Sequence, residues 1–289
     1  MTSRRTFCSF SATAMALSAM SGNSVASEIP LKFGHRQANM AHEPGPSVFE
    51  LADRIQGLRG VELQVVWKGQ DLGDRQTALS YKKMAHDWGV QIPSIAGIWA
   101  PGQTIFQAEV APRVLERAVR AADLLGASVI LVALFDKNCP RIDDFSSYAG
   151  PVALLQQVAP MASDAGIVLG LETSLSPADD KKFVEMIGHP AVQIYYDATN
   201  KELAFPGQSI PGIDLLAPHL AQVHLKNETR LLSDHARVNW AQAVETLSRL
   251  RYQGWYVFET EHSGPEQCVA ATEQNIAFVR RFSVSLTRF

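Results

Sequence analysis

The segment Ile167-Val168-Leu169-Gly170-Leu171-Glu172 contains the pattern that decides the fold. It is a run of apolar residues that begins directly after a glycine and ends in an acidic side chain. Apolar residues at nearly every position are typical of a parallel strand whose two faces are both covered by helices. The segment therefore predicts a buried strand over residues 167–171, with Glu172 at its carboxyl end.

Runs of the same kind recur along the chain from residue 31 onward. Amphipathic segments with helical periodicity, such as residues 113–125, separate the runs. Eight alternating strand and helix units in a chain of 289 residues predict a single-domain (β/α)8 barrel, a fold of about 250 residues. The expected strands are Leu31–Gly34, Val61–Val65, Gln91–Gly97, Ser128–Leu134, Ile167–Leu171, Val192–Tyr196, Leu220–Leu225 and Tyr256–Phe258.

An open, doubly wound sheet is the main alternative for such an alternation. Its dinucleotide-binding members carry the fingerprint GxGxxG after the first strand. In this chain Gly34-His35-Arg36-Gln37 stands at that place and lacks the fingerprint, so we expect the closed barrel. Among the helix boundaries, Asn239 is the expected N-cap of one helix and Gly188 the expected end of another.

Residues 1–26 have the composition of a targeting segment. Ser3-Arg4-Arg5-Thr6-Phe7 resembles the twin-arginine export motif, and a weakly apolar stretch over residues 10–20 follows it. Ser24-Val25-Ala26 fits a cleavage site, which leaves residues 27–289 as the barrel. The stretch is too short to be a stable membrane anchor. We therefore expect export of the folded protein by the twin-arginine machinery to the periplasm.

Charge and cysteine usage exclude some classes of partner and site. The formal net charge of −3 gives no electrostatic footprint for nucleic acid. The expected mature chain keeps two cysteines, Cys139 and Cys268, on opposite sides of the predicted ring. That separation exceeds the ~7 Å between Cα atoms that a disulfide tolerates, so we expect two free thiols.

Four consecutive predicted strands end in side chains that are able to bind a metal: Glu172, Asp197, His224 and Glu259. The carboxyl ends of barrel strands share one rim, where catalytic groups gather. Charged groups at such positions are costly to bury unless they are paired or bound to a metal. Three carboxylates and one imidazole suit one Mn²⁺ or Mg²⁺ ion, and Co²⁺ or Zn²⁺ could also occupy them.

The chain also resembles a family over residues 31–282. The matching motifs lie at residues 170–172, 196–200, 223–227 and 254–259, which read GLE, YDATN, VHLKN and GWYVFE. They are similar to xylose-isomerase-like barrels of the sugar phosphate isomerase/epimerase group. The resemblance implies that the four residues named above bind one metal, and that Arg230 helps to bind substrate. Thr173-Ser174 and Asn227 depart from the residues that many members carry.

The resemblance further implies that Glu172 and Glu259 lie on opposite faces of a sugar-like substrate. One would remove a proton next to a carbonyl and the other would return it, through an ene-diolate. The expected function is isomerisation or epimerisation of an unphosphorylated sugar, keto-sugar or cyclitol. A lyase or dehydratase on the same site and a non-catalytic sugar-binding barrel are alternatives. An abasic-site endonuclease is disfavoured, because it needs more histidine ligands and a basic groove.

Other residues near the predicted rim are weaker candidates. His35 and Glu62, on the first two strands, could contact substrate or support the metal ligands. Trp99 could stack on a sugar ring. We expect Lys226 to point away from the metal site, and His262 to lie at the surface or at a helix cap. The sequence leaves the oligomeric state open, including a homo-oligomer.

Overall fold

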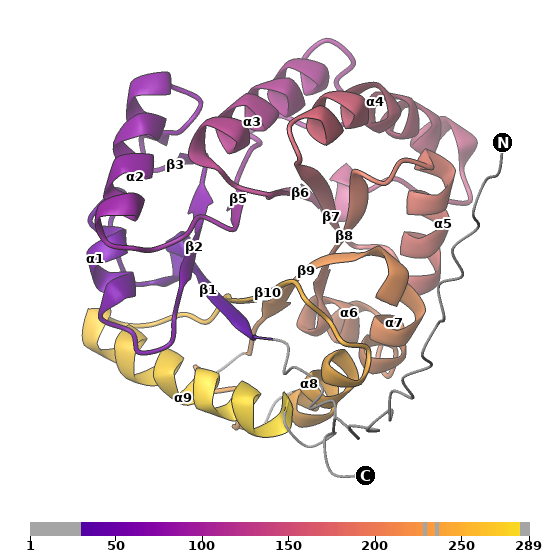
Figure 1. Cartoon of the computed structure of the whole chain (residues 1–289). Coiled ribbons are helices and arrows are strands. Elements are labelled where there is room, and N and C mark those ends of the chain that lie inside the picture. Colours follow the sequence, from indigo (N-terminus) through magenta and orange to yellow (C-terminus); the bar gives the residue numbers. More distant parts are fainter. Residues whose placement is uncertain (1–29, 228–229, 235–236, 284–289) are drawn as a thin grey trace, which may run out of the picture.

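The strands form a closed parallel barrel, as the sequence predicts (Figure 1). The computed structural model describes residues 30–227, 230–234 and 237–283, so the expected targeting segment lies outside the described residues. Around the ring, β1 is followed by β10, β9, β8, β7, β6, β5 and β2, which pairs with β1 again. The strands are β1 (Lys32–Arg36), β2 (Gly60–Gln64), β5 (Ser94–Ala96), β6 (Val129–Leu134), β7 (Val168–Thr173), β8 (Val192–Asp197), β9 (Leu220–Leu225) and β10 (Trp255–Phe258).

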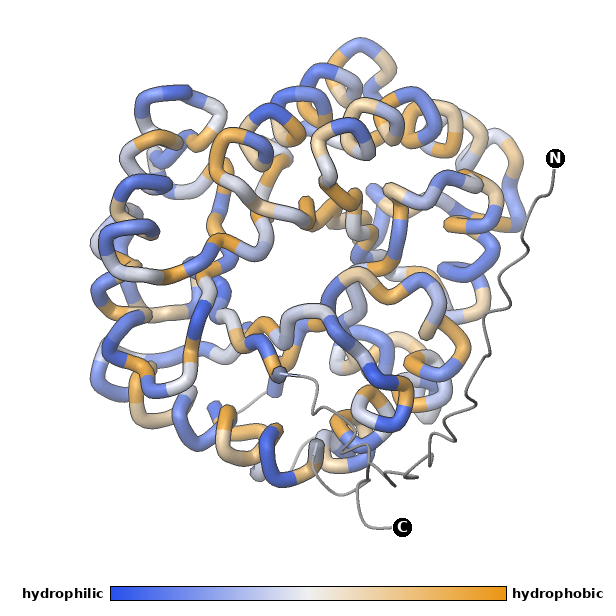
Figure 2. Tube along the Cα trace, viewed as in Figure 1, coloured by the Kyte–Doolittle hydropathy of each residue, from blue (hydrophilic) through white to orange (hydrophobic). Residues whose placement is uncertain are grey.

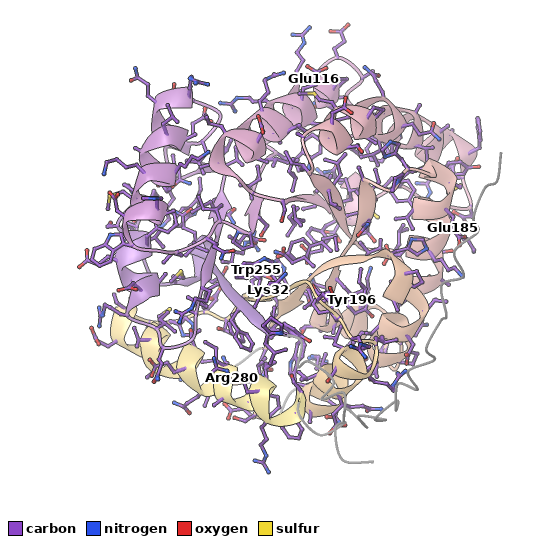
Figure 3. The ribbon with its side chains drawn as sticks, in the orientation of Figure 1. Lys32, Glu116, Glu185, Tyr196, Trp255 and Arg280 are labelled. Atoms are coloured by element: carbon purple, nitrogen blue, oxygen red, sulfur yellow. The ribbon has the colours of Figure 1, made fainter. Side chains whose placement is uncertain are left out.

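Helices form the outer layer of the barrel. Figure 2 shows hydrophilic and hydrophobic residues alternating along them, and in Figure 3 the labelled Glu116 and Glu185 lie on the outside of the ring. Such amphipathic helices bury one face against the strands. Their bounds are α1 (Val48–Asp53), α2 (Arg75–Asp87), α3 (Ala111–Leu125), α4 (Phe145–Asp164), α5 (Pro177–Ile187), α6 (Ala198–Ala204), α7 (Ser209–Leu216), α8 (Trp240–Arg249) and α9 (Pro265–Ser283). None of the described helices is long and apolar enough to cross a membrane.

Alternation along β6 shows how the core is divided. Ile130, Val132 and Leu134 belong to the large cluster between strands and helices, whereas Val129 and Leu131 pack with Tyr195 in a small separate cluster. Successive side chains of a strand point to opposite faces, so the small cluster fills the barrel interior. The interior is therefore packed, and the site must lie at a rim.

Three strands extend beyond their predicted ends, and each extension bears on the site. β1 continues to Arg36, β7 to Thr173 and β8 to Asp197. The sequence analysis did not predict a short antiparallel hairpin of β3 (Val66–Trp67) and β4 (Gln70–Asp71), which lies outside the barrel sheet.

Two helix ends lie where the sequence predicts them. Asn239 caps α8 by accepting a hydrogen bond from the amide of Gln242, at 3.2 Å. Gly188 follows α5 with φ of 66°, a left-handed conformation that glycine adopts without a steric penalty. Cys139 and Cys268 are both buried and free, which confirms the expected absence of a bond between them.

Candidate metal centre

The four predicted ligand residues meet at the carboxyl rim of the barrel. Glu172 lies in β7, Asp197 ends β8, His224 lies in β9, and Glu259 directly follows β10. One donor atom of each lies within 4.8 Å of the donor atoms of the other three. All four side chains are buried, with at most 9% of their surface exposed. The residues chosen from the sequence thus form one compact cluster.

Glu62 of β2 sets the orientation of His224. Its Oε1 lies 3.2 Å from His224 Nε2. A ring nitrogen that donates its proton to a carboxylate leaves the lone pair on the other nitrogen. That other nitrogen, Nδ1, faces Glu259 at 3.3 Å and Glu172 at 3.8 Å, and is buried without a hydrogen-bond partner among the described residues. Metal-binding imidazoles are held by carboxylates in this way.

A hydrogen-bonded network inside the barrel holds Glu62 in turn. Glu62 Oε2 accepts hydrogen bonds from the hydroxyls of Ser94 (2.8 Å) and Tyr195 (2.6 Å). The amide of Gln222 donates to both of these hydroxyl oxygens, at 2.7 and 2.8 Å. All four residues are buried. Buried networks of this kind fix the positions of their members, so β2, β5, β8 and β9 together orient the imidazole of His224.

The first turn of α6 positions two of the carboxylates. Asp197 Oδ1 caps the helix by accepting from the amide of Asn200 at 2.9 Å. Its other oxygen, Oδ2, is buried and has no hydrogen-bond partner in the described structure. The side-chain amide of Asn200 donates to Glu172 Oε1 at 3.0 Å. One Asp197 oxygen is therefore occupied by the helix, and the second remains available to a cation.

Two cations also enter the cluster, and the sequence analysis did not identify either as a site residue. Arg36, at the end of β1, donates to Glu259 Oε1 and lies 3.6 Å from Glu62 Oε1. Lys226 Nζ lies 3.3 Å from Glu259 Oε2 and 3.8 Å from Asp197 Oδ2. The expectation that Lys226 points away is wrong. Residues two apart on a strand share a face, so Lys226 projects on the same side as His224.

The cluster has a net negative charge that a divalent cation would neutralise. Two permanent cations, Arg36 and Lys226, stand against four buried carboxylates: Glu62, Glu172, Asp197 and Glu259. When His224 is neutral, as a metal ligand must be, two negative charges remain, which equal the charge of one divalent cation. Together with the unpaired His224 Nδ1 and Asp197 Oδ2, this donor set fits such an ion.

The pKa values of the cluster show the same excess of negative charge. Burial, with the neighbouring Glu172 and Glu259, raises the pKa of Asp197 to about 7. Burial alone would lower the pKa of His224, but Glu259 and Glu62 outweigh it and raise that pKa well above its usual value. Burial acts to raise the pKa of Glu259, yet His224 and the two cations hold it below its usual value. These carboxylates therefore attract positive charge strongly.

A cavity of about 230 Å³ opens directly onto the cluster. Its wall includes Glu172, Glu259, Asn200 and Trp99. Trp99 thus lines the cavity beside the cluster, and its contact with a substrate stays a prediction. The remaining lining residues are Arg36, Gly97, Ile98, Leu131, Ala133, Phe135 and Lys226.

The other predicted substrate contacts are not among the residues that line this cavity. Glu62 lies beneath the cluster and supports His224. His35 is fully buried and lies 3.3 Å from His262, ring nitrogen to ring nitrogen. The expectation that His262 lies at the surface or caps a helix is therefore wrong. Arg230 is exposed, and its carbonyl accepts from Asn275 of α9 at 2.8 Å.

A buried ion pair next to the cluster was also missed from the sequence. Lys201 of α6 pairs with Asp180 of α5 at 2.6 Å. Its ammonium also donates to the carbonyl oxygens of Thr173 (2.9 Å) and Leu175 (2.8 Å). Because Thr173 directly follows Glu172, Lys201 helps to fix the end of β7. Lysine in a short helix is ordinarily solvated, so composition alone gives no signal for this role.

Comparison with known protein families agrees with the fold. The family model described as xylose isomerase-like TIM barrel matches residues 49–282. The chain belongs to this family. A search of curated proteins found no match. The family assignment thus rests on the family model, and it agrees with the resemblance seen in the motifs.

Solved structures of sugar epimerases share the fold of this family member. D-Psicose 3-epimerase with D-tagatose from Clostridium cellulolyticum H10 is 15% identical, with a TM-score of 0.71 over 88% of this chain and 99% of that one. E. coli 3-keto-D-glucoside 4-epimerase is 18% identical, with a TM-score of 0.70 over 87% and 100%. A xylose isomerase-like barrel from Mycobacterium smegmatis in complex with magnesium is 16% identical, with a TM-score of 0.66 over 89% and 98%.

Proposed function

We propose that this protein is a divalent-metal-dependent isomerase or epimerase of an unphosphorylated sugar, keto-sugar or cyclitol. The family and the sugar epimerases that share its fold support this class of reaction. We further propose Mn²⁺ as the ion, since three carboxylates and one imidazole form an oxygen-rich site. Export to the periplasm by the twin-arginine route is part of the same proposal and rests on Arg4 and Arg5.

The convergence of Glu172, Asp197, His224 and Glu259 carries the proposal. Their donor atoms lie within 4.8 Å of one another in a buried cluster that is short of positive charge. A structural ion-pair network would balance its charges internally, as buried charges otherwise cost several kcal/mol each. The imbalance is what a resident divalent cation would relieve.

The bound metal would act as a Lewis acid that polarises a substrate carbonyl and acidifies the neighbouring C–H bond. We assign the removal of that proton to Glu172, because Arg36 and Lys226 stabilise the ionised form of Glu259 and weaken it as a proton acceptor. The side-chain amide of Asn200 donates a hydrogen bond to Glu172 and fixes the position of its carboxylate. The Lys226 ammonium, 3.3 Å from Glu259, would supply a proton through Glu259 to the other face of the same carbon, which gives the epimer, or to the neighbouring carbon, which gives the isomer.

Elimination is a second candidate, and the position of Lys226 favours it. The ammonium lies 3.3 Å from Glu259 and lines the cavity, where it could protonate a departing hydroxyl group. Proton removal by Glu172 followed by loss of water would then give a dehydrated product. The two outcomes share the first step and differ in whether the substrate keeps its oxygen.

Proton exchange tests the proposal most economically. The purified protein is stripped of metal, reloaded with Mn²⁺ and incubated in D₂O with ketoses and cyclitol ketones. We expect deuterium at the carbon next to the carbonyl, with a product of unchanged mass for isomerisation or epimerisation. A product lighter by one water indicates elimination. Bound ketose without any exchange would contradict an enzyme and favour a sugar-binding barrel.

The export proposal has a separate test. Replacing Arg4 and Arg5 together by lysine should retain folded, active protein in the cytoplasm, whereas the unchanged chain should reach the periplasm. Equal periplasmic amounts of the two proteins would contradict the twin-arginine route.

A further inference from the structure

A second group of metal-binding side chains lies at the seam where the barrel closes. His35 comes from β1, His262 from the loop after β10, and Cys268 from α9. One donor atom of each lies within 4.8 Å of the donor atoms of the other two. This group, here the His2Cys cluster, shares no residue with the four-ligand cluster.

The two imidazoles already have the spacing of two ligands on one ion. His35 Nε2 and His262 Nε2 lie 3.3 Å apart. Two nitrogens bound to one tetrahedral Zn²⁺ at about 2.0–2.1 Å lie roughly 3.3–3.4 Å from each other. Cys268 is fully buried beside them, with no disulfide partner.

The tautomer of His35 is also that of a metal ligand. Its Nδ1 lies 3.1 Å from the carbonyl oxygen of Arg36, which can only accept a hydrogen bond. The proton therefore lies on Nδ1, and the lone pair of Nε2 points toward His262. A backbone carbonyl that holds the far nitrogen is the usual support of a metal-bound histidine.

The two ring nitrogens of His262 have different surroundings. His262 Nδ1 is buried and has no hydrogen-bond partner in the part of the chain that the structure describes. The Thr260 hydroxyl lies 3.1 Å from His262 Nε2. A hydroxyl or a water molecule at this place could complete four-coordination of an ion.

We propose that His35, His262 and Cys268 bind a second metal ion of the zinc class. Two imidazoles and one thiolate are borderline-soft donors that suit Zn²⁺, whereas the four-ligand cluster offers hard oxygens. Binding converts the Cys268 thiol to a thiolate and releases its proton to solvent. The ion would tie α9 to β1 and β10, and would stiffen the backbone next to Arg36.

Cobalt substitution tests this proposal, because a thiolate bound to Co²⁺ absorbs strongly in the near ultraviolet and a site without sulfur does not. Metal-free full-length protein titrated with Co²⁺ should develop this absorption, release about one proton per ion bound at this cluster, and lose the absorption when Zn²⁺ is added. Asp197→Asn, which impairs only the four-ligand cluster, should keep the absorption.

Two variants and one control identify the ligands. Cys268→Ser should abolish the absorption, and His262→Gln, at a half-buried position, should weaken cobalt binding by at least about tenfold. Cys139→Ser removes the other buried free thiol of the described residues and should leave the spectrum unchanged. No sulfur absorption in folded wild-type protein, or absorption that survives in folded Cys268→Ser, would overturn the proposal and leave a hydrogen-bonded histidine pair.

Discussion

Two clusters of buried charge lie side by side at the carboxyl rim of this barrel, and they are built differently. In the four-ligand cluster, Glu172, Asp197 and Glu259 share their surroundings with too few cations, and the pKa of Asp197 rises to about 7. In the neighbouring cluster, one ammonium from Lys201 meets one carboxylate from Asp180 at 2.6 Å. The first has surplus negative charge, whereas the second pairs each charge with a partner.

The difference predicts a functional role for the four-ligand cluster and a structural role for the Lys201–Asp180 pair. A cluster that needs an external cation has surplus negative charge when the cation is absent. We therefore expect its carboxylates to contribute to chemistry more than to folding. A paired cluster is complete within the chain, and removing one partner leaves an isolated buried charge. Loss of charge in the first cluster should therefore reduce activity, whereas loss of charge in the second should reduce stability.

The largest expected effect is on turnover. Asp197→Asn should lower kcat/KM by about 10³-fold or more, because it removes a carboxylate ligand. The metal-free protein should be as stable as the wild type or more stable at pH 8, since asparagine also caps helices and one repelled charge is lost. Steady-state kinetics and denaturant unfolding measure both quantities. Glu261→Gln, an exposed position near Glu259, is the control and should behave as wild type.

The paired cluster should respond in the opposite sense. Lys201→Met should lower the free energy of unfolding by about 3–5 kcal/mol at pH 8, because it leaves the Asp180 carboxyl buried without its cation. Lys182→Met, which breaks an exposed pair with Asp179, should cost less than about 1 kcal/mol. Equal losses in the two variants would show that the buried pair has no special structural role.

The cost of Lys201→Met should also depend on pH. Burial raises the pKa of Asp180 to about 6, despite the opposing effect of Lys201. A carboxyl whose folded pKa is raised contributes its stability at low pH, and this contribution is lost as pH rises from about 4 through the folded pKa. Removing the cation raises that pKa further, so the loss extends to higher pH. The cost should be smaller at pH 5 than at pH 8 by about 1–3 kcal/mol, and a constant cost would contradict this assignment.

The smallest expected effect concerns a cation of the first cluster. Lys226→Met should tighten binding of Mn²⁺ by about tenfold, since the ammonium lies 3.3 Å from Glu259 and 3.8 Å from Asp197 and competes with the ion. Calorimetric titration of the metal-free proteins measures the change. Weaker binding in the variant would mean that Lys226 organises the carboxylates rather than competing with the metal.

The sequence predicted the fold and the convergence of four candidate ligand side chains because both follow from local pattern. Each apolar run ends within two residues of the end of a strand, and parallel strands of one barrel bring those ends to one rim. Glu172 and Asp197 could therefore be selected one strand at a time. The same reasoning should also have placed Lys226 in the site, since it stands two residues after His224.

The supports of the site depend on contacts that strand patterns do not contain. Arg36 reaches Glu259 only because β1 closes the ring against β10. Glu62 meets His224 across the barrel interior, 162 positions away in the chain. Arg230 was inferred from resemblance alone, and its exposed position in the structure does not place it against the cavity. Such pairs form only when the barrel closes, so a pattern that predicts single strands does not predict them.

Anomalous scattering from manganese tests the central claim most directly. Crystals of the metal-free protein are soaked in Mn²⁺, and data are collected at the manganese absorption edge. We predict one strong anomalous peak between Glu172, Asp197, Glu259 and His224 Nδ1, with His224 Nε2 still bound to Glu62. Crystals soaked to saturation with Mn²⁺ that show no anomalous peak at this position would contradict a metal centre at this rim. The same holds if the side chains of Arg36 and Lys226 alone occupy the position.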